Sequence, residues 1–164
     1  MKKIIILLVA LMATFNLSAQ QKKWRTINVN TCVLNTTVTF TNGTQYGDHI
    51  FIGLGMGVDH LTPINITLEN TTYSIGGYSV PIFMDGKWRL FDTWLSPSLR
   101  VRIGAMYNFD VVGAGVFAYP EIGLDISRRL TLSVGWNGQM MYSMYYGTWY
   151  DVSAQPCFGL SWKF

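Results

Sequence analysis

Two histidines, His49 and His60, are the side chains of this chain best suited to acid–base chemistry near neutral pH. Asp59 directly precedes His60, so a carboxylate stands next to an imidazole in the sequence. Adjacent residues on a strand point to opposite faces, and the two groups therefore cannot form an acid–base pair on a regular strand. A His-x-Ser sequence, which would place a hydroxyl nucleophile near the base, is absent. We predict no catalytic residues.

Glycines recur at every second position in Gly53-x-Gly55-x-Gly57. A nucleotide-binding loop needs the spacing G-x-G-x-x-G and a helix directly after it, and neither is present here. Glycines on one face of a strand leave room for bulky neighbours such as Phe51. With two histidines and two cysteines scattered along the chain, a metal site is not indicated either. We therefore expect no cofactor and no metal.

Charged residues recur at alternating positions in the second half of the chain. Because residues two apart on a strand share a face, the charges of each segment gather on one face. Both signs are present, and an unpaired buried charge is very costly, so we expect ion pairs. The set comprises Asp85, Lys87, Arg89, Arg100, Arg102, Glu121 and Asp125.

Alternation of apolar and polar residues extends well beyond these charges. Hydrophobic residues make up 49% of the chain and charged residues only 13%, against about 25% charged in soluble domains. Yet beyond the N-terminus no apolar run approaches the roughly 20 residues of a transmembrane helix. Strands with one apolar and one polar face explain both facts. Six segments have this period of two: 49–59, 79–90, 99–109, 121–126, 130–142 and 155–164.

The phase of the alternation changes near residues 30–32, which indicates either two strands, about 23–30 and 33–41, or one bulged strand. Single-chain bacterial barrels have an even number of strands, which favours two strands here and eight in total. We predict an all-β fold, a closed antiparallel up-and-down transmembrane β-barrel. A soluble periplasmic ligand-binding barrel, with the apolar faces packed together, is the alternative.

Two features favour lipid outside the barrel. The polar faces carry mostly Gly, Ser, Thr and Asn, whereas the exposed face of a soluble protein carries many more charges. Aromatic residues also cluster near the segment ends on the apolar face, where amphipathic rings meet the lipid headgroups. This predicted girdle comprises Tyr78, Trp88, Tyr107, Tyr142, Trp162 and Phe164.

The interior of an eight-stranded barrel is just wide enough for side chains. We therefore predict that the seven charges form a lumen network centred on Arg102 and Glu121, which counting from the turns places within about two residues of each other. The same counting places Lys87 near Arg102. A structural plug is the favoured interpretation, and an ion-conducting path or a binding site is the alternative.

Cys32 and Cys157 stand near opposite ends of the chain. Barrel closure makes the first and last strands neighbours, so a disulfide across this seam is compatible with an oxidising periplasm. If Cys32 lies on the second strand, the two residues are too far apart for a disulfide. Of the two possible outcomes, a disulfide between Cys32 and Cys157 or two unpaired thiols, we expect the unpaired thiols.

Loop lengths suggest an orientation, since short turns of bacterial barrels lie on the periplasmic side and longer loops outside. We expect periplasmic turns near 42–43, 91–97 and 127–129, periplasmic termini, and outward loops at 61–76 and 143–152. The second loop carries aromatic residues that form either a surface for an extracellular partner or part of the outer aromatic belt. They are Tyr145, Tyr146, Trp149 and Tyr150.

The first 19 residues have the pattern of a secretory signal peptide. Lys2 and Lys3 precede an apolar stretch at 4–12, and cleavage is expected after Ala19. This leaves residues 20–164 as the barrel. The net charge of +3, with no clustered basic stripe, gives no support for nucleic-acid binding.

Several segments resemble the small outer-membrane β-barrel protein family of Bacteroides-type Gram-negative bacteria. They are 79–91 (SVPIFMDGKWRLF), 96–101 (SPSLRV), 119–124 (YPEIGL) and 158–164 (FGLSWKF), and the resemblance spans residues 46–164. It implies an integral outer-membrane protein in contact with lipid, whose aromatic C-terminus is read by the barrel assembly machinery. No catalytic residues carry over, and a structural or interaction role is expected. An outer-leaflet lipid-modifying enzyme of the deacylase or acyltransferase type is the alternative.

Overall fold

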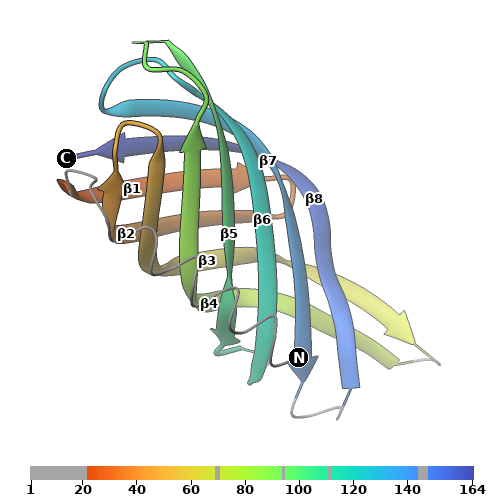
Figure 1. Ribbon diagram of the computed structural model, residues 1–164. Coiled ribbons are helices and arrows are strands. Elements are labelled where there is room, and N and C mark those ends of the chain that lie inside the picture. Colours follow the sequence, from red (N-terminus) through yellow and green to blue (C-terminus); the bar gives the residue numbers. More distant parts are fainter. Residues whose placement is uncertain (1–21, 69–70, 94, 111, 144–147) are drawn as a thin grey trace, which may run out of the picture.

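The computed structural model describes residues 22–68, 71–93, 95–110, 112–143 and 148–164. Each strand pairs antiparallel with the next, and the last pairs with the first, which closes the barrel (Figure 1). The predicted all-β, up-and-down barrel of eight strands is therefore confirmed. The strands are β1 (Lys22–Cys32), β2 (Asn35–Tyr46), β3 (Ile50–Leu68), β4 (Thr71–Arg89), β5 (Ser96–Asn108), β6 (Gly113–Asp125), β7 (Leu130–Ser143) and β8 (Thr148–Lys163).

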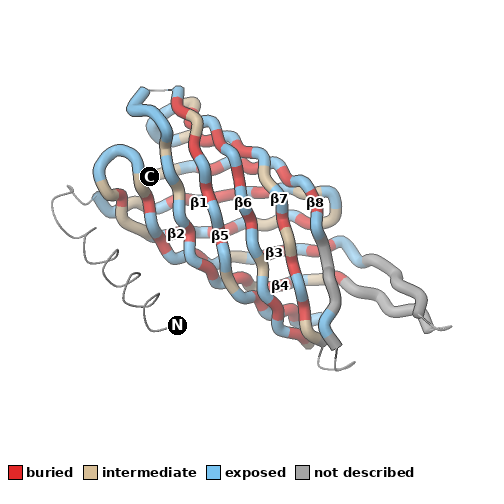
Figure 2. The backbone as a smooth tube through the Cα atoms, turned by 45° about the vertical axis from the view of Figure 1, so that its right-hand side comes forward, coloured by how far each residue is buried: buried red, intermediate tan, exposed pale blue. Residues whose placement is uncertain are grey.

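Burial alternates along each strand, as the sequence predicts (Figure 2). Most buried residues are polar, and the large hydrophobic residues lie mainly on the outside. On β5, Ile103 is 59% exposed whereas its neighbour Arg102 is 2% exposed. The period of two alone produces this division, because successive side chains of a strand leave opposite faces of the sheet. Among the described residues, no helix is long and apolar enough to cross a membrane.

The barrel has two distinct ends. We call the one that holds the start of β1 and the finish of β8 the terminal end, and the opposite one the distal end. The connections at the terminal end are 47–49, 90–95 and 126–129. Two of these match the predicted turns near 91–97 and 127–129.

The turn predicted at 42–43 is wrong. Asn42 and Gly43 lie within β2 and pair with Arg25 and Trp24 of β1. The chain turns at Gly47 instead, which has a positive φ of 59°. Gly43 has a packing role, since a Cβ there would lie 2.7 Å from the Phe51 ring. Asn-Gly is a strong local turn signal, but here pairing on both sides of β2 overrides it.

The two predicted outward loops are largely strand. Residues 61–68 and 71–76 continue β3 and β4 as a paired hairpin, with a register shift between Leu61 and Ile64. Trp149 and Tyr150 belong to β8, and the connection after β7 is limited to 144–147. Tyr145 and Tyr146 lie outside the described residues, as does the side chain of Tyr150.

The expectation of unpaired thiols is also wrong, because Cys32 and Cys157 form a disulfide. β1 runs to Cys32 instead of ending near residue 30, so Cys32 belongs to the first strand. It lies directly opposite Cys157 across the β1–β8 seam, with 4.0 Å between the two Cα atoms. The apolar pattern changes phase near residues 30–32 because β1 ends there. The short connection 33–34 then leads into a separate strand, β2.

A small apolar cluster fills the interior at the distal end. Leu61, Met106 and Met141 are almost fully buried there, and Leu34 and Phe117 pack against them. We call these five residues the distal plug. The sequence pattern does not indicate the distal plug, because the outward loop predicted at 61–76 leaves Leu61 outside the barrel.

Candidate functional site: the charged lumen

The seven charged residues of the predicted network come from three neighbouring strands and point into the barrel. β4 contributes three of them, and its register places Asp85 beside Arg102 and Lys87 beside Arg100. β5 and β6 place Arg100 beside Glu121. The period of two along each strand therefore stacks the charges along the barrel axis.

Arg100 occupies the middle of the network with its donors satisfied. Its Nε lies 2.7 Å from Oδ1 of Asp85, and a second nitrogen contacts the other carboxylate oxygen. Its Nη1 donates to Oδ1 of Asn28 at 2.7 Å and to Oγ of Ser161 at 2.9 Å. The bidentate pair with Asp85 is the strong form of an Arg–carboxylate contact and joins β5 to β4. The contacts of Nη1 join β5 to β1 and β8.

Arg102 forms an ion pair with Glu121, and both are almost fully buried. Its guanidinium carbon lies 4.4 Å from the centre of the Tyr119 ring and 6.0 Å from that of Phe83. Cation–π contacts of this kind favour the charge where water is excluded. Arg100 reaches the same carboxylate at 3.8 Å.

Nearer the terminal end, Asp125 binds two cations. Nζ of Lys87 lies 2.5 Å from one carboxylate oxygen, and Nε of Arg89 lies 2.8 Å from the other. Lys87 also donates to the Thr131 hydroxyl at 2.8 Å. These cations are partly exposed, at 16–17% of their side chains, so water screens this pair of contacts more than the inner ones.

The structure thus brings all seven predicted residues together. Some of the ion pairs join residues that are two positions apart in the strand register and do not lie directly opposite each other. Arg102 lies beside Tyr119 in the register and reaches Glu121 diagonally, while Lys87 lies beside Arg100 instead of Arg102. Long side chains span such diagonal neighbours on a sheet, which is why counting from the turns identifies the group but not each pair.

Asp59 lies apart from this network, near the distal plug. It is buried and accepts hydrogen bonds from Nδ2 of Asn35 at 2.8 Å, Oγ1 of Thr37 at 2.5 Å and Nε2 of Gln139 at 3.3 Å. None of the ion pairs between described residues includes it. These partners come from β2 and β7.

His60 points away from Asp59, to the outer face of the barrel, where its ring lies 4.8 Å from that of Tyr78. The geometry therefore does not provide an acid–base pair at this position. Within the described ranges, no three His, Cys, Asp or Glu side chains are grouped as a metal site would require.

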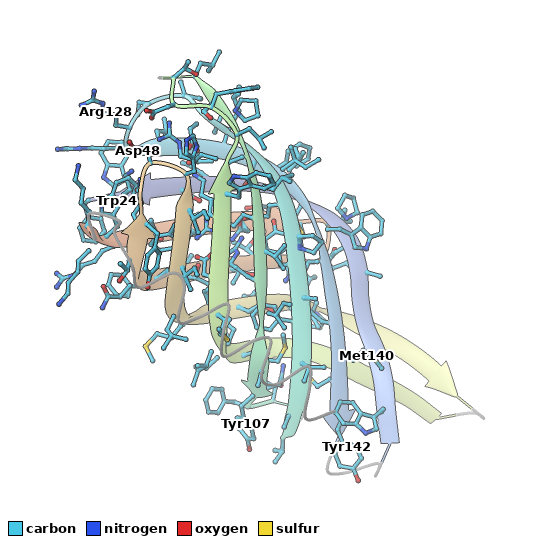
Figure 3. All side chains as sticks on the ribbon, in the orientation of Figure 1. Trp24, Asp48, Tyr107, Arg128, Met140 and Tyr142 are labelled. Carbon is cyan, nitrogen blue, oxygen red and sulfur yellow. A yellow bond between two sulfur atoms is a disulfide. The ribbon has the colours of Figure 1, made fainter. Side chains whose placement is uncertain are left out.

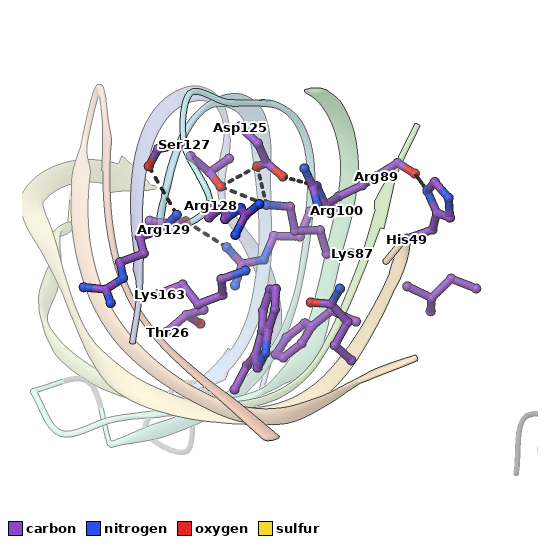
Figure 4. A pocket seen from close by; sticks show the side chains of 16 residues that line it. Thr26, His49, Lys87, Arg89, Arg100, Asp125, Ser127, Arg128, Arg129 and Lys163 are labelled. Atoms are coloured by element: carbon purple, nitrogen blue, oxygen red, sulfur yellow. Dashed lines mark hydrogen bonds and ion pairs between the residues drawn. The ribbon is translucent and has the colours of Figure 1, made fainter. Parts of the chain in front are cut away.

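The lumen contains two small cavities separated by side chains. One, of about 40 Å³, lies at the terminal end, where Lys87 and Arg89 converge on Asp125 (Figure 4). The other, of about 20 Å³, lies between Arg102 and the distal plug. Arg100 lines the first cavity, Arg102 and Tyr119 line the second, and the buried Glu121 carboxylate contacts both arginines.

The predicted girdle residues lie on the outer face or partly exposed, toward the two ends. Trp88, Trp162 and Phe164 are near the terminal end, and Tyr78, Tyr107 and Tyr142 are near the distal end. Figure 3 shows Tyr107 and Tyr142 at the end opposite Trp24 and Arg128. The ring of Trp149 packs against that of Tyr142 in a tilted arrangement, with ring centres 5.5 Å apart.

No protein-family model matches this sequence, and no curated protein sequence is similar to it. Among the solved structures that match this chain are two β-barrels. The N-terminal β-barrel domain of OprF from Pseudomonas aeruginosa is 14% identical, with a TM-score of 0.47 over 89% of this chain and 98% of its own. A de novo designed transmembrane β-barrel is 16% identical, with a TM-score of 0.42 over 90% of this chain and 100% of its own. At these values neither protein conveys a function or a ligand to this chain.

Proposed function

We propose that the chain is an integral outer-membrane β-barrel with a closed interior, which serves as an anchored structural or interaction protein. One observation carries this proposal: the polarity of the fold is inverted. Phe158 is 72% exposed on the outside, whereas Asn108 is fully buried inside. A soluble barrel of the same topology would have these two classes of residue exchanged.

The inverted polarity is stable in lipid and unstable in water. Soluble monomers rarely expose contiguous apolar patches above a few hundred Å², and here apolar side chains cover the outside of all eight strands. In a bilayer the same face is solvated by acyl chains, and barrel closure satisfies the backbone groups that lipid cannot. The strands are 11 to 19 residues long, which meets or exceeds the roughly 9–11 residues that a tilted strand needs to cross.

The closed lumen favours an anchor over a pore. The Arg102–Glu121 pair and the distal plug occupy successive sections of the interior. We assign no reaction to the chain, since Asp59 and His60 point to opposite faces of β3. The hairpin of β3 and β4 extends beyond the neighbouring strands (Figure 1), and the ring pair of Tyr142 and Trp149 adds an exposed aromatic surface on β7 and β8. We infer that the distal end is where a partner binds.

We further propose that residues 1–19 are removed on export, which leaves residues 20–164 as the mature barrel. In this proposal both termini lie in the periplasm. The barrel assembly machinery reads the β8 segment that ends in Phe164. The segments that resemble the Bacteroides-type family support these inferences. The girdle residues support the membrane insertion on which these inferences depend, since their two rows fit the two headgroup boundaries.

The test combines a gel and a conductance measurement. A folded barrel from the membrane fraction should migrate differently on a denaturing gel before and after boiling, and the purified protein should give no steady steps in a planar bilayer. Recovery of the protein in the soluble fraction without detergent would contradict the membrane assignment. Steady channel steps that disappear in an Arg102→Ala variant would contradict the closed lumen.

A further inference from the structure

The terminal end of the barrel carries a concentration of positive charge that the lumen network does not neutralise. Where the β1–β8 seam meets the connection 126–129, a groove crosses the rim of the barrel. Six residues line it, and four of them are cations: Lys23, Trp24, Arg128, Arg129, Lys163 and Phe164. We call this the seam groove.

None of the ion pairs formed by described residues includes a cation of the seam groove. The lumen cavity of about 40 Å³ at the terminal end adjoins the groove. The two share the lining residues Trp24, Arg128, Arg129 and Lys163. Its one lining carboxylate, Asp125, already binds Lys87 and Arg89. The other acidic residues of this end, Asp48 and Asp92, are on the connections 47–49 and 90–95 and do not line the groove.

Backbone contacts hold the groove in place. The amide of Lys163 donates to the carbonyl of Arg129 at 2.7 Å, which ties the connection 126–129 to β8. The amide of Phe164 donates to the carbonyl of Arg25 at 3.0 Å, which ties β8 to β1. Within the connection, Oγ of Ser127 accepts the amides of Arg129 at 3.2 Å and of residue 130 at 3.0 Å. The cations therefore project from an ordered frame.

The groove opens toward the apolar outside of the barrel. Phe164 is 55% exposed, and its ring lies 6.4 Å from that of Phe40 on the outer face of β2. At the inner side the ammonium of Lys163 lies against the ring of Trp24. A ligand that fits would carry its negative charge among the cations and its apolar part over Phe164 and Phe40.

We propose that the seam groove binds the phosphate of an anionic lipid headgroup in the adjacent leaflet. Arg and Lys are the side chains that recognise phosphate, by fork geometry and by point charge respectively. A free phosphate ion shares this chemistry, but it would make no use of the apolar opening. The inference rests on the proposed membrane insertion of the barrel.

The experiment uses native mass spectrometry of the full-length protein with added phosphatidylglycerol or phosphatidylcholine. We expect a preference for phosphatidylglycerol that an Arg128→Gln/Arg129→Gln variant weakens by roughly tenfold or more, since each arginine removed takes away charge-assisted hydrogen bonds to the bound phosphate. The matched control, Lys22→Gln/Arg25→Gln, removes two charges from the same end outside the groove and should retain the preference.

Equal weakening by both double variants would overturn the proposal in favour of general charge attraction. Equal binding of the two lipids by the original protein would also overturn it. Inorganic phosphate that binds as tightly as phosphatidylglycerol would assign the groove to a free ion instead. The gel shift on boiling is recorded for every variant, so a barrel that folds without lipid preference refutes this inference alone, and a protein that is not a membrane barrel refutes the proposed function.

Discussion

Replacing Glu121 by glutamine tests how much free energy the barrel loses when a buried charge of the lumen network is left without its partner. The substitution preserves the volume and shape of the side chain, so it creates no cavity. It leaves Arg102 without its carboxylate partner, whereas Arg100 retains its bidentate contact with Asp85. The guanidinium of Arg102 cannot escape by losing a proton, and the variant must therefore bury an unpaired charge.

The magnitude follows from these contacts. Removing one partner of a buried ion pair costs about 3–5 kcal/mol. The ring of Tyr119, 4.4 Å from the Arg102 guanidinium carbon, remains and offsets part of this cost. We therefore expect a loss of about 3 kcal/mol in the free energy of unfolding, at the low end of that range. The matched variant Asp125→Asn, whose cations Lys87 and Arg89 are partly exposed, should lose about 1 kcal/mol.

Urea titration in phospholipid vesicles, followed by the gel shift, measures these losses. A double-mutant cycle adds Arg102→Gln to Glu121→Gln. Because Nε of Arg102 and Oε2 of Glu121 find no hydrogen-bond partner in the described structure, the pair itself contributes little, and the double variant should recover most of the loss. The reasoning is refuted if Glu121→Gln costs no more than Asp125→Asn.

Three further substitutions address other parts of the barrel by the same unfolding assay. The Cys32→Ser/Cys157→Ser variant should lose about 4–5 kcal/mol, because the disulfide closes a long loop across the seam, and identical stability of the original protein with and without reductant would contradict this. Leu61→Ala should cost about 3 kcal/mol by opening a cavity in the distal plug, and Leu54→Ala, on the outer face, should cost clearly less. Ile103→Arg should cost about 2–4 kcal/mol in vesicles, since it places a charge against lipid, and no cost would contradict a lipid-facing Ile103.

The overall fold was predictable from the sequence because its main signal is local. The alternation of residues such as Leu132, Ser133 and Val134 assigns each side chain to a face without knowledge of its neighbours. The same alternation placed the seven charges on the inner face. Counting from the turns placed Arg102 within about two residues of Glu121, and these two residues form an ion pair. The same counting placed Lys87 near Arg102, whereas the register between strands places it beside Arg100.

The features that the sequence did not reveal depend on contacts between distant segments. The role of Gly43 is set by the Phe51 ring on the next strand, so a local turn signal misleads. Cys32 meets Cys157 only because β1 extends two residues beyond residue 30, where its apolar pattern predicts that the strand ends. The seam groove joins Lys23 to Arg128 and Arg129 by closure of the barrel, and nothing in their own segments marks them as neighbours.

The most direct test of the account is the environment of Val134, half-exposed on the outer face of β7. A nitroxide spin label on a Val134→Cys variant, reconstituted in phospholipid vesicles, is exposed to oxygen, which concentrates in lipid, and to a water-soluble nickel chelate. We predict strong relaxation by oxygen and little by the chelate, with the reverse for Asp48→Cys on the connection 47–49. Relaxation of the Val134 label by the chelate to the extent seen at residue 48 would contradict a barrel whose apolar face is solvated by lipid.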